Sequence, residues 1–85
     1  MRTFEYTIKD AVGIHARPAG MLVNAIKPFE SEVIIDRNGK SVDAKRLMAL
    51  MGLGVKCGDT IKVTVNGADE DAAAEALEKF LTENL

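Results

Sequence analysis

The chain has 85 residues and a formal net charge of −2; 47% of its residues are hydrophobic and 28% are charged. This composition is that of an ordinary globular protein, and the length suits one domain over residues 1–85 that is too small to enclose a large cofactor. No apolar run approaches the roughly 20 residues that span a bilayer, and the N-terminus alternates rather than forming a signal-peptide core, so we expect a cytoplasmic protein without membrane insertion.

The spacing of apolar residues predicts a first strand and a first helix. Residues 2–8 alternate between apolar and polar side chains, which is typical of a half-buried strand. The apolar face of this strand consists of Phe4, Tyr6 and Ile8. After a corner at residues 13–20, a helix is predicted over residues 16–27, and Pro28 ends it because proline cannot continue the hydrogen-bond ladder. The apolar positions of this helix are Met21, Leu22, Ala25 and Ile26.

A tight hairpin follows the first helix. Residues 31–37 and 40–43 are predicted to be two short strands. Asn38 and Gly39 between them supply the two positive-φ positions that a two-residue turn requires. We therefore expect the two strands to pair antiparallel.

A second, shorter helix and another strand come next. Ser41 or Asp43 is expected to cap this helix, which continues through about residue 52 and is closed by Gly52 and Gly54. Residues 60–66 alternate again and predict the fourth strand. Its inward positions are Ile61, Val63 and Val65.

The last segment predicts a third helix and completes the order βαββαβα. Asp69, Glu70 and Asp71 place negative charge on a first turn, where the helix dipole favours it. The buried stripe of this helix is expected to be Ala73, Leu77, Phe80 and Leu81. Four strands with one apolar face each need helices on that face only, which predicts an open-faced α+β sandwich. The same order also suits a ferredoxin-like domain, so spacing alone leaves the strand order open.

Cysteine usage and charge exclude several functions. Cys57 is the only cysteine and is expected to be an inert turn residue, and with a single histidine there is no Cys/His cluster for zinc. We expect no metal and no cofactor. The basic residues are few and not interleaved with aromatic ones, which argues against nucleic acid. An acidic protein partner or a phosphate fits the charge pattern better.

The stretch GIHARPAG at residues 13–20 carries most of the chemistry. If Ala16, Arg17 and Pro18 form the first helical turn, His15 occupies the cap position, where unpaired backbone N–H groups stabilise anions. The backbone of Ala16 and Arg17 is then a phosphate site. A partly neutral imidazole at His15 offers a nucleophilic nitrogen, and the Arg17 guanidinium matches phosphate oxygens. The plainer alternatives are a histidine that only caps the helix and a surface arginine.

At these residues the sequence resembles the HPr phosphocarrier proteins of the phosphoenolpyruvate-dependent sugar phosphotransferase system. The resemblance covers essentially the whole chain. Besides GIHARPA at 13–19, it rests on NGK at 38–40, MGLGV at 51–55, GD at 58–59 and GADE at 67–70. It implies a single domain over residues 1–85 with a four-stranded antiparallel sheet in the order 1-4-2-3, covered on one face by three helices.

The resemblance also implies a phosphoryl relay. Phosphoenzyme I is expected to phosphorylate His15 on Nδ1 with the help of Arg17, and phospho-His15 to pass the group to IIA domains of sugar permeases. Such a protein is a covalent carrier rather than a stand-alone enzyme. The alternatives are a regulatory HPr paralogue that signals nitrogen or carbon status, and a ferredoxin-like binding module in which His15 is only a cap.

The apolar stretch at residues 47–54 is expected to dock the protein partners. A short surface helix buries only one stripe, so some of these side chains must stay exposed. The expected partner-binding residues are Leu47, Met48, Met51, Lys27 and Arg46, whereas Leu50 and Leu53 are expected in the core. The basic residues Arg17, Lys27, Lys45 and Arg46 are expected to attract an acidic partner surface.

One position departs from the family pattern. HPr proteins of Gram-positive type carry a regulatory serine at the start of this helix, and here the residue is Arg46. We therefore expect no regulatory phosphorylation at this site. We expect the protein to be a monomer.

Overall fold

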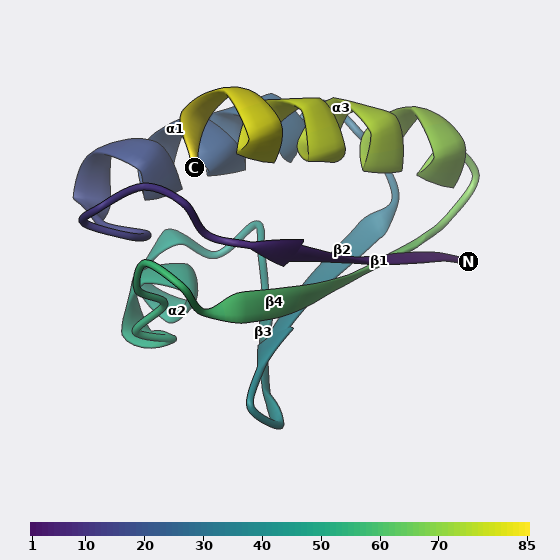
Figure 1. Ribbon diagram of the computed structural model, residues 1–85. Helices are drawn as coiled ribbons and strands as arrows, with labels where there is room; N and C mark the ends of the chain where they lie inside the picture. The colour runs from purple at the N-terminus through teal and green to yellow at the C-terminus, as the bar shows by residue number, and fades with distance from the viewer.

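The computed structural model describes residues 1–85 as seven elements that form a sheet with helices packed on one face (Figure 1). The elements are β1 (Arg2–Thr7), α1 (Ala16–Ile26), β2 (Glu32–Arg37), β3 (Lys40–Asp43), α2 (Leu47–Gly52), β4 (Thr60–Asn66) and α3 (Glu70–Asn84). The strand order is β1-β4-β2-β3 and every pair is antiparallel. This is the order that the resemblance implies, and it settles what spacing alone left open.

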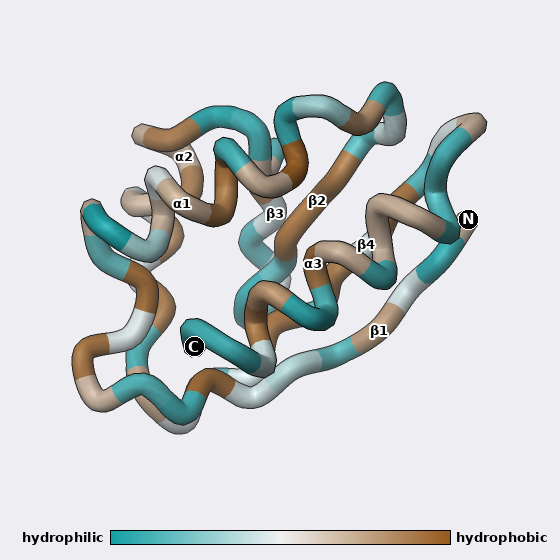
Figure 2. Tube along the Cα trace, turned by 90° about the horizontal axis from the view of Figure 1, so that it is seen from above, coloured by the Kyte–Doolittle hydropathy of each residue, from teal (hydrophilic) through white to brown (hydrophobic).

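Alternating side chains explain why the sheet buries one face. Val63 of β4 lies opposite Phe4 of β1 and opposite Ile35 of β2, so apolar positions stay in register across three strands. The inward residues of β2 and β4 are completely buried: Val33, Ile35, Ile61, Val63 and Val65. Seen from above, the hydrophobic stretch of β2 runs between α1 and α3 (Figure 2). The apolar face of the sheet therefore forms the floor of the core, and these two helices form its roof.

The turn between β2 and β3 has the expected geometry. Asn38 has φ 52° and Gly39 has φ 85°, which are the two positive values that a two-residue hairpin loop needs. The Asp36 carboxylate accepts hydrogen bonds from the Gly39 N–H and the Ser41 hydroxyl, so it holds the turn from one side.

The prediction that Ser41 or Asp43 caps the second helix is wrong. Arg46 is the N-cap residue of α2, and no side chain caps this helix. The Ser41 hydroxyl is occupied by Asp36 in the hairpin, and the Asp43 carboxylate accepts the Lys45 N–H two residues further on. Residues 44–45 form a turn after β3, in which the Arg46 N–H bonds to the Asp43 carbonyl at 3.1 Å, and helix α2 begins only after this turn, at Leu47.

Two buried stripes also differ in part from the prediction. In α1, Leu22 and Ile26 are buried as expected, but the Met21 side chain is 42% exposed. In α3, Ala74 is fully covered while Phe80 is only half-buried. Helix α3 contacts α1 as well as β1 and β4, and α1 contacts both α3 and α2, so the sheet alone does not determine which side chains of these helices are buried.

Asp69 ties the beginning of α3 to the segment before β2. Its carboxylate accepts the N–H groups of Glu30 and Ser31, each at 2.9 Å, and the Ser31 hydroxyl. These bonds replace a cap of its own helix, since the Asp69 side chain makes no cap hydrogen bond. The Ser31 hydroxyl first, and the Glu30 N–H second, hold the pKa of the Asp69 carboxyl below its ordinary value.

We predict that Asp69→Asn lowers the free energy of unfolding at pH 7 and weakens its dependence on acid. A carboxyl whose pKa is lowered by folding stabilises the protein above its unfolded pKa of about 3.9, and this stabilisation disappears as the pH falls through the folded value. Urea denaturation between pH 7 and pH 3 measures both effects. Asp71→Asn is the matched control, because the Asp71 carboxylate bonds only to the exposed Arg2 guanidinium. Parallel pH profiles of Asp69→Asn and the wild type contradict the prediction.

Candidate functional site

The N-terminal end of α1 presents the only histidine to solvent. His15 is the N-cap residue, with an extended backbone at φ −125° and ψ −171°. Its carbonyl oxygen accepts the Ala19 N–H at 2.9 Å and so starts the helix. His15 is therefore the cap residue of the helix through its backbone, while its exposed imidazole makes no cap hydrogen bond. The ring nitrogens are free for a reaction.

Two unpaired backbone donors follow His15 in the first turn of α1. The N–H groups of Ala16 and Arg17 have no acceptor in the chain, as is usual for the first turn of a helix. Pro18 is buried and has no N–H to satisfy, which suits its place in this turn. Two free donors at the positive end of an 11-residue helix favour an anion next to His15.

A shallow hollow brings distant residues to the corner. Its lining residues are Asp10, His15, Arg17, Pro18, Met21 and Asn84. Sequence reasoning missed Asp10, Met21 and Asn84. The Asp10 carboxylate accepts the N–H groups of Val12 and Gly13, and an aspartate three residues before a glycine is a turn signal that could have revealed it. No local signal places Asn84 there, because it reaches the corner through the packing of α3 against α1.

The backbone just before His15 is fixed by a close approach to the loop that follows α2. Gly13 has φ +82°, and a Cβ atom at this position would lie 2.5 Å from the Val55 carbonyl oxygen. The next residue, Ile14, donates its N–H to the same oxygen at 3.0 Å. On the other side, the Leu85 carbonyl accepts the N–H of Asp10 at 2.8 Å. The corner is therefore held between two distant segments of the chain.

The expected docking residues fall into an exposed and a covered group. Met48 is 77% exposed and Leu47 39% exposed, whereas Leu50 and Leu53 are buried as predicted. Met51 is half-buried and packs against the core, so only part of its side chain is accessible. Helix α2 packs against α1, which places this apolar surface next to the helix that carries the histidine at its start.

The basic residues do not all gather at the histidine. Lys27 and Arg46 are exposed, but Lys27 follows the far end of α1, about 18 Å along the helix axis from His15. The Lys45 ammonium donates to the Phe29 carbonyl and is half-buried. Lys27, Lys45 and Arg46 thus contribute only to the electrostatic potential of the surface. Arg17 is the only cation that lines the hollow at His15.

Two exposed apolar residues lie near the corner, and the sequence analysis assigned neither of them to the site. Val12 is 66% exposed and lies three residues before His15, and Met21 is 42% exposed at the rim of the hollow. Single exposed apolar residues are common, so their exposure alone carries no functional signal in the sequence.

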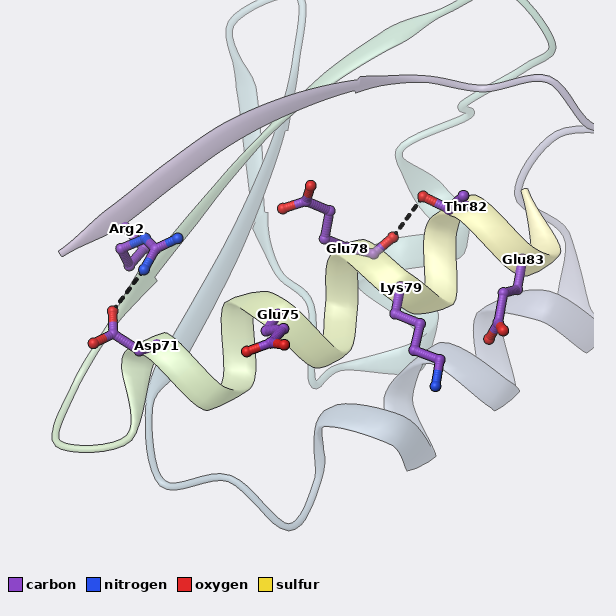
Figure 3. A pocket seen from close by; sticks show the side chains of 7 residues that line it. All are labelled: Arg2, Asp71, Glu75, Glu78, Lys79, Thr82 and Glu83. Atoms are coloured by element: carbon purple, nitrogen blue, oxygen red, sulfur yellow. Dashed lines mark hydrogen bonds and ion pairs between the residues drawn. The ribbon is translucent and has the colours of Figure 1, made fainter.

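A larger hollow lies along the exposed side of α3, beside Arg2 (Figure 3). Its lining is entirely polar or charged. The Arg2 guanidinium bonds to the Asp71 carboxylate at 2.8 Å, and the Thr82 hydroxyl bonds to the Glu78 carbonyl (Figure 3). This hollow is the solvated acidic face of a helix.

The other side chains that could bind a metal or react do not gather in one place. No three His, Cys, Asp or Glu side chains come together in a way that could hold a metal ion. Cys57 is exposed, and its nearest polar contact is the Lys9 carbonyl at 3.8 Å. None of the three helices combines the length and the hydropathy needed to cross a bilayer.

Comparison with known proteins identifies the family of the chain. The family described as the PTS HPr component phosphorylation site matches residues 2–83. The chain is 42% identical over 83 residues to the phosphocarrier protein HPr of Lysinibacillus sphaericus, which covers 98% of this chain and 94% of that protein. Among solved structures, HPr of Thermoanaerobacter tengcongensis superposes with a TM-score of 0.93 at 35% identity, covering 98% of this chain and 93% of that one.

A second structure from Thermoanaerobacter tengcongensis, described as an HPr dimer, has a TM-score of 0.78 and covers 98% of this chain and 95% of that one. The chain thus has the open-faced sandwich fold of a phosphocarrier protein, with a histidine at a helix start whose side chain makes no cap hydrogen bond. The chain belongs to the HPr family of the phosphotransferase system. That this chain is itself a monomer stays a prediction.

We predict that Gly13→Ala destabilises the protein more than Gly39→Ala. Both glycines have φ near 80°, so alanine at either one costs about 1 kcal/mol in backbone strain. Only at Gly13 does the new Cβ meet the Val55 carbonyl, which adds a further ~1–3 kcal/mol. Nothing lies within 4 Å of the corresponding Cβ at Gly39, which makes that variant the control. Urea denaturation measures the difference, and equal losses at the two sites would falsify the steric argument.

Proposed function

We propose that this protein accepts a phosphoryl group from phosphoenzyme I on His15 and passes it to IIA domains of sugar permeases. The observation that carries the proposal is the exposed imidazole of His15, free of hydrogen bonds at the start of α1, with two unpaired N–H donors beside it. The membership of the HPr family supports the same function.

The residues at the corner fit each part of a phosphoryl transfer. A ring nitrogen of His15 attacks phosphorus while the bond between phosphorus and the donor nitrogen of phosphoenzyme I breaks, and the electron pair of that bond returns to the donor. Negative charge builds up on the three equatorial oxygens. The N–H groups of Ala16 and Arg17 and the Arg17 guanidinium stabilise it. The reverse attack by an acceptor nucleophile releases the group to a IIA domain.

The same groups make a metal ion unnecessary for the proposed step. Magnesium neutralises phosphoryl oxygens in kinases, and here a permanent cation and two backbone donors occupy the corresponding position. The proposed role is that of a carrier, since the hollow at His15 is shallow and offers no enclosure for a sugar.

The proposed docking surface lies on α2 beside the corner. Met48 and Leu47 provide exposed apolar contact, and Met51 adds its accessible part. Lys27 and Arg46 add positive charge that attracts an acidic partner and speeds encounter. Flexible methionines suit a surface that must bind enzyme I and a IIA domain in turn.

We predict that phosphoenzyme I adds one phosphoryl group to the wild type and none to His15→Ala. Incubation with enzyme I and phosphoenolpyruvate followed by intact-mass spectrometry measures this, and the added mass is expected to disappear in acid because the bond to histidine is a phosphoramidate. Cys57→Ser is the control, because Cys57 is exposed and does not line the hollow at His15.

An unmodified wild type in the presence of a competent enzyme I would overturn the proposal. If the group is accepted, the identity of the recipient separates the two HPr roles. Transfer to a sugar-permease IIA domain supports the transport role, and transfer only to a regulatory IIA domain supports the signalling alternative.

We predict that an ATP-dependent HPr kinase leaves the wild type unmodified and phosphorylates Arg46→Ser. Arg46 is exposed as the N-cap residue of α2 and has no hydroxyl group, so the variant supplies the missing acceptor in an accessible position. Phosphoserine analysis after incubation with the kinase distinguishes the two proteins. Stoichiometric phosphoserine in the wild type would show that another serine takes over this role.

A further inference from the structure

The loop from Leu53 to Asp59, here called the 53–59 loop, joins the two parts of the proposed site. It follows α2 directly, so its first residue continues the docking helix. Three backbone hydrogen bonds connect it to the segment that leads to His15. These are Ile14 N–H to the Val55 carbonyl at 3.0 Å, Gly58 N–H to the Ile8 carbonyl at 2.8 Å, and Ile8 N–H to the Asp59 carbonyl at 2.9 Å. A shift of this loop therefore moves both the docking helix and the histidine corner.

One side-chain pair holds the 53–59 loop at both ends. The Arg37 side chain, at the end of β2, donates from Nε to the Asp59 carboxylate at 2.8 Å and from a terminal nitrogen to the Leu53 carbonyl at 3.2 Å. The same carboxylate oxygen of Asp59 accepts the Lys56 N–H at 2.8 Å. Arg37 thus touches the first and the last residue of the loop, while Asp59 closes the turn between them.

The surroundings make this pair stronger than an ordinary surface ion pair. Both side chains are 28% exposed, whereas the other side-chain pair, Arg2 and Asp71, is 54% and 79% exposed. Well-exposed pairs contribute little because water and salt screen them. The Arg37–Asp59 pair is better shielded and also satisfies a backbone carbonyl and a backbone N–H. The Lys56 N–H first, and the Arg37 guanidinium after it, hold the pKa of the Asp59 carboxyl below its ordinary value.

Arg37 also lies at the C-terminal end of α2, where the helix dipole favours positive charge. Leu53 is the C-cap residue of α2, and its carbonyl is the one that Arg37 binds. The Lys40 ammonium donates to the neighbouring Gly52 carbonyl at 3.4 Å. The hairpin formed by β2 and β3 therefore provides two cations for the negative end of the docking helix.

We propose that Arg37 and Asp59 are positioning residues that fix the docking helix α2 relative to His15. This proposal rests on the function proposed above. Neither side chain lines the hollow at His15, so both act through the 53–59 loop. When the pair is intact, His15 has a fixed position relative to a partner that is bound at Met48. Without it, the partner must order the loop upon binding, and binding weakens while the transfer step stays nearly unchanged.

The test is a comparison of two ion pairs in the reaction with phosphoenzyme I. The variants Arg37→Met, Asp59→Asn and their double mutant are expected to raise the KM for this protein about fivefold, as expected from losing one charge-assisted hydrogen bond, with kcat altered less than twofold. The double mutant is expected to raise KM no more than Arg37→Met alone, because Arg37→Met already removes the bond to Asp59 together with the bond to the Leu53 carbonyl. Arg2→Met, Asp71→Asn and their double mutant form the control and are expected to leave KM unchanged.

Two further variants serve as references for the size of the change in KM. Met48→Asp removes apolar docking contact directly and is expected to raise KM at least as much. Arg37→Lys keeps the charge but lacks the planar fork, so it is expected to recover only part of the loss. All measurements are made well below each variant's melting temperature, where a residue that only stabilises the fold leaves KM unaffected.

Backbone amide NMR provides a readout that does not depend on phosphoryl transfer. In Arg37→Met, resonances of Ile14 to Arg17 and of α2 are expected to shift together. Shifts confined to β2 and β3, or a KM equal to that of the control pair while Met48→Asp raises it, overturn the positioning role. A wild type that accepts no phosphoryl group refutes the proposed function instead, and the NMR comparison then still decides whether the pair positions the loop.

Discussion

The first turn of α1 must leave its backbone donors open and still be rigid, and most of the structure near His15 follows from this requirement. The N–H groups of Ala16 and Arg17 have no partner in the chain, and no side chain caps the helix. The carboxylate closest in sequence, that of Asp10, bonds instead to the turn at Val12 and Gly13. Rigidity comes from outside the helix, through the contact between Gly13 and Val55. An anion at the corner thus meets donors that need no rearrangement.

The small core divides the short helix α2 between residues that pack inside and residues of the proposed docking surface. Leu50 and the adjoining Leu53 are buried, so the helix is anchored by its inner side. Leu47 and Met48, on the same six-residue helix, remain exposed. A helix this short has little stability of its own, and its orientation therefore depends on the groups at its ends. The hydrogen bonds from Arg37 and Lys40 to its last carbonyls meet this need.

Much of the fold could be predicted from the sequence, since strands with one buried face must alternate and the turn at Asn38 and Gly39 requires positive φ. The position of His15 at a helix start was predicted correctly for the same kind of local reason, because Pro18 fits only the first turn. The cap of α2 was not, because Ser41 and Asp43 belong to β3 and a turn at residues 44–45 separates this strand from the helix. Asn84 at the hollow depends on the packing of two helices and has no signature in any local pattern.

The pairing of β1 has a consequence for the biosynthesis of the protein. In the sheet this strand pairs only with β4, so residues 2–7 have no partner strand until residues 60–66 have left the ribosome. The backbone before His15 likewise waits for Val55, and for Leu85 at the end of α3. Contacts between such distant segments close late, since the chain between them must first be ordered. A nascent chain in which residues 55–85 are not yet available therefore exposes the histidine without the geometry that surrounds it.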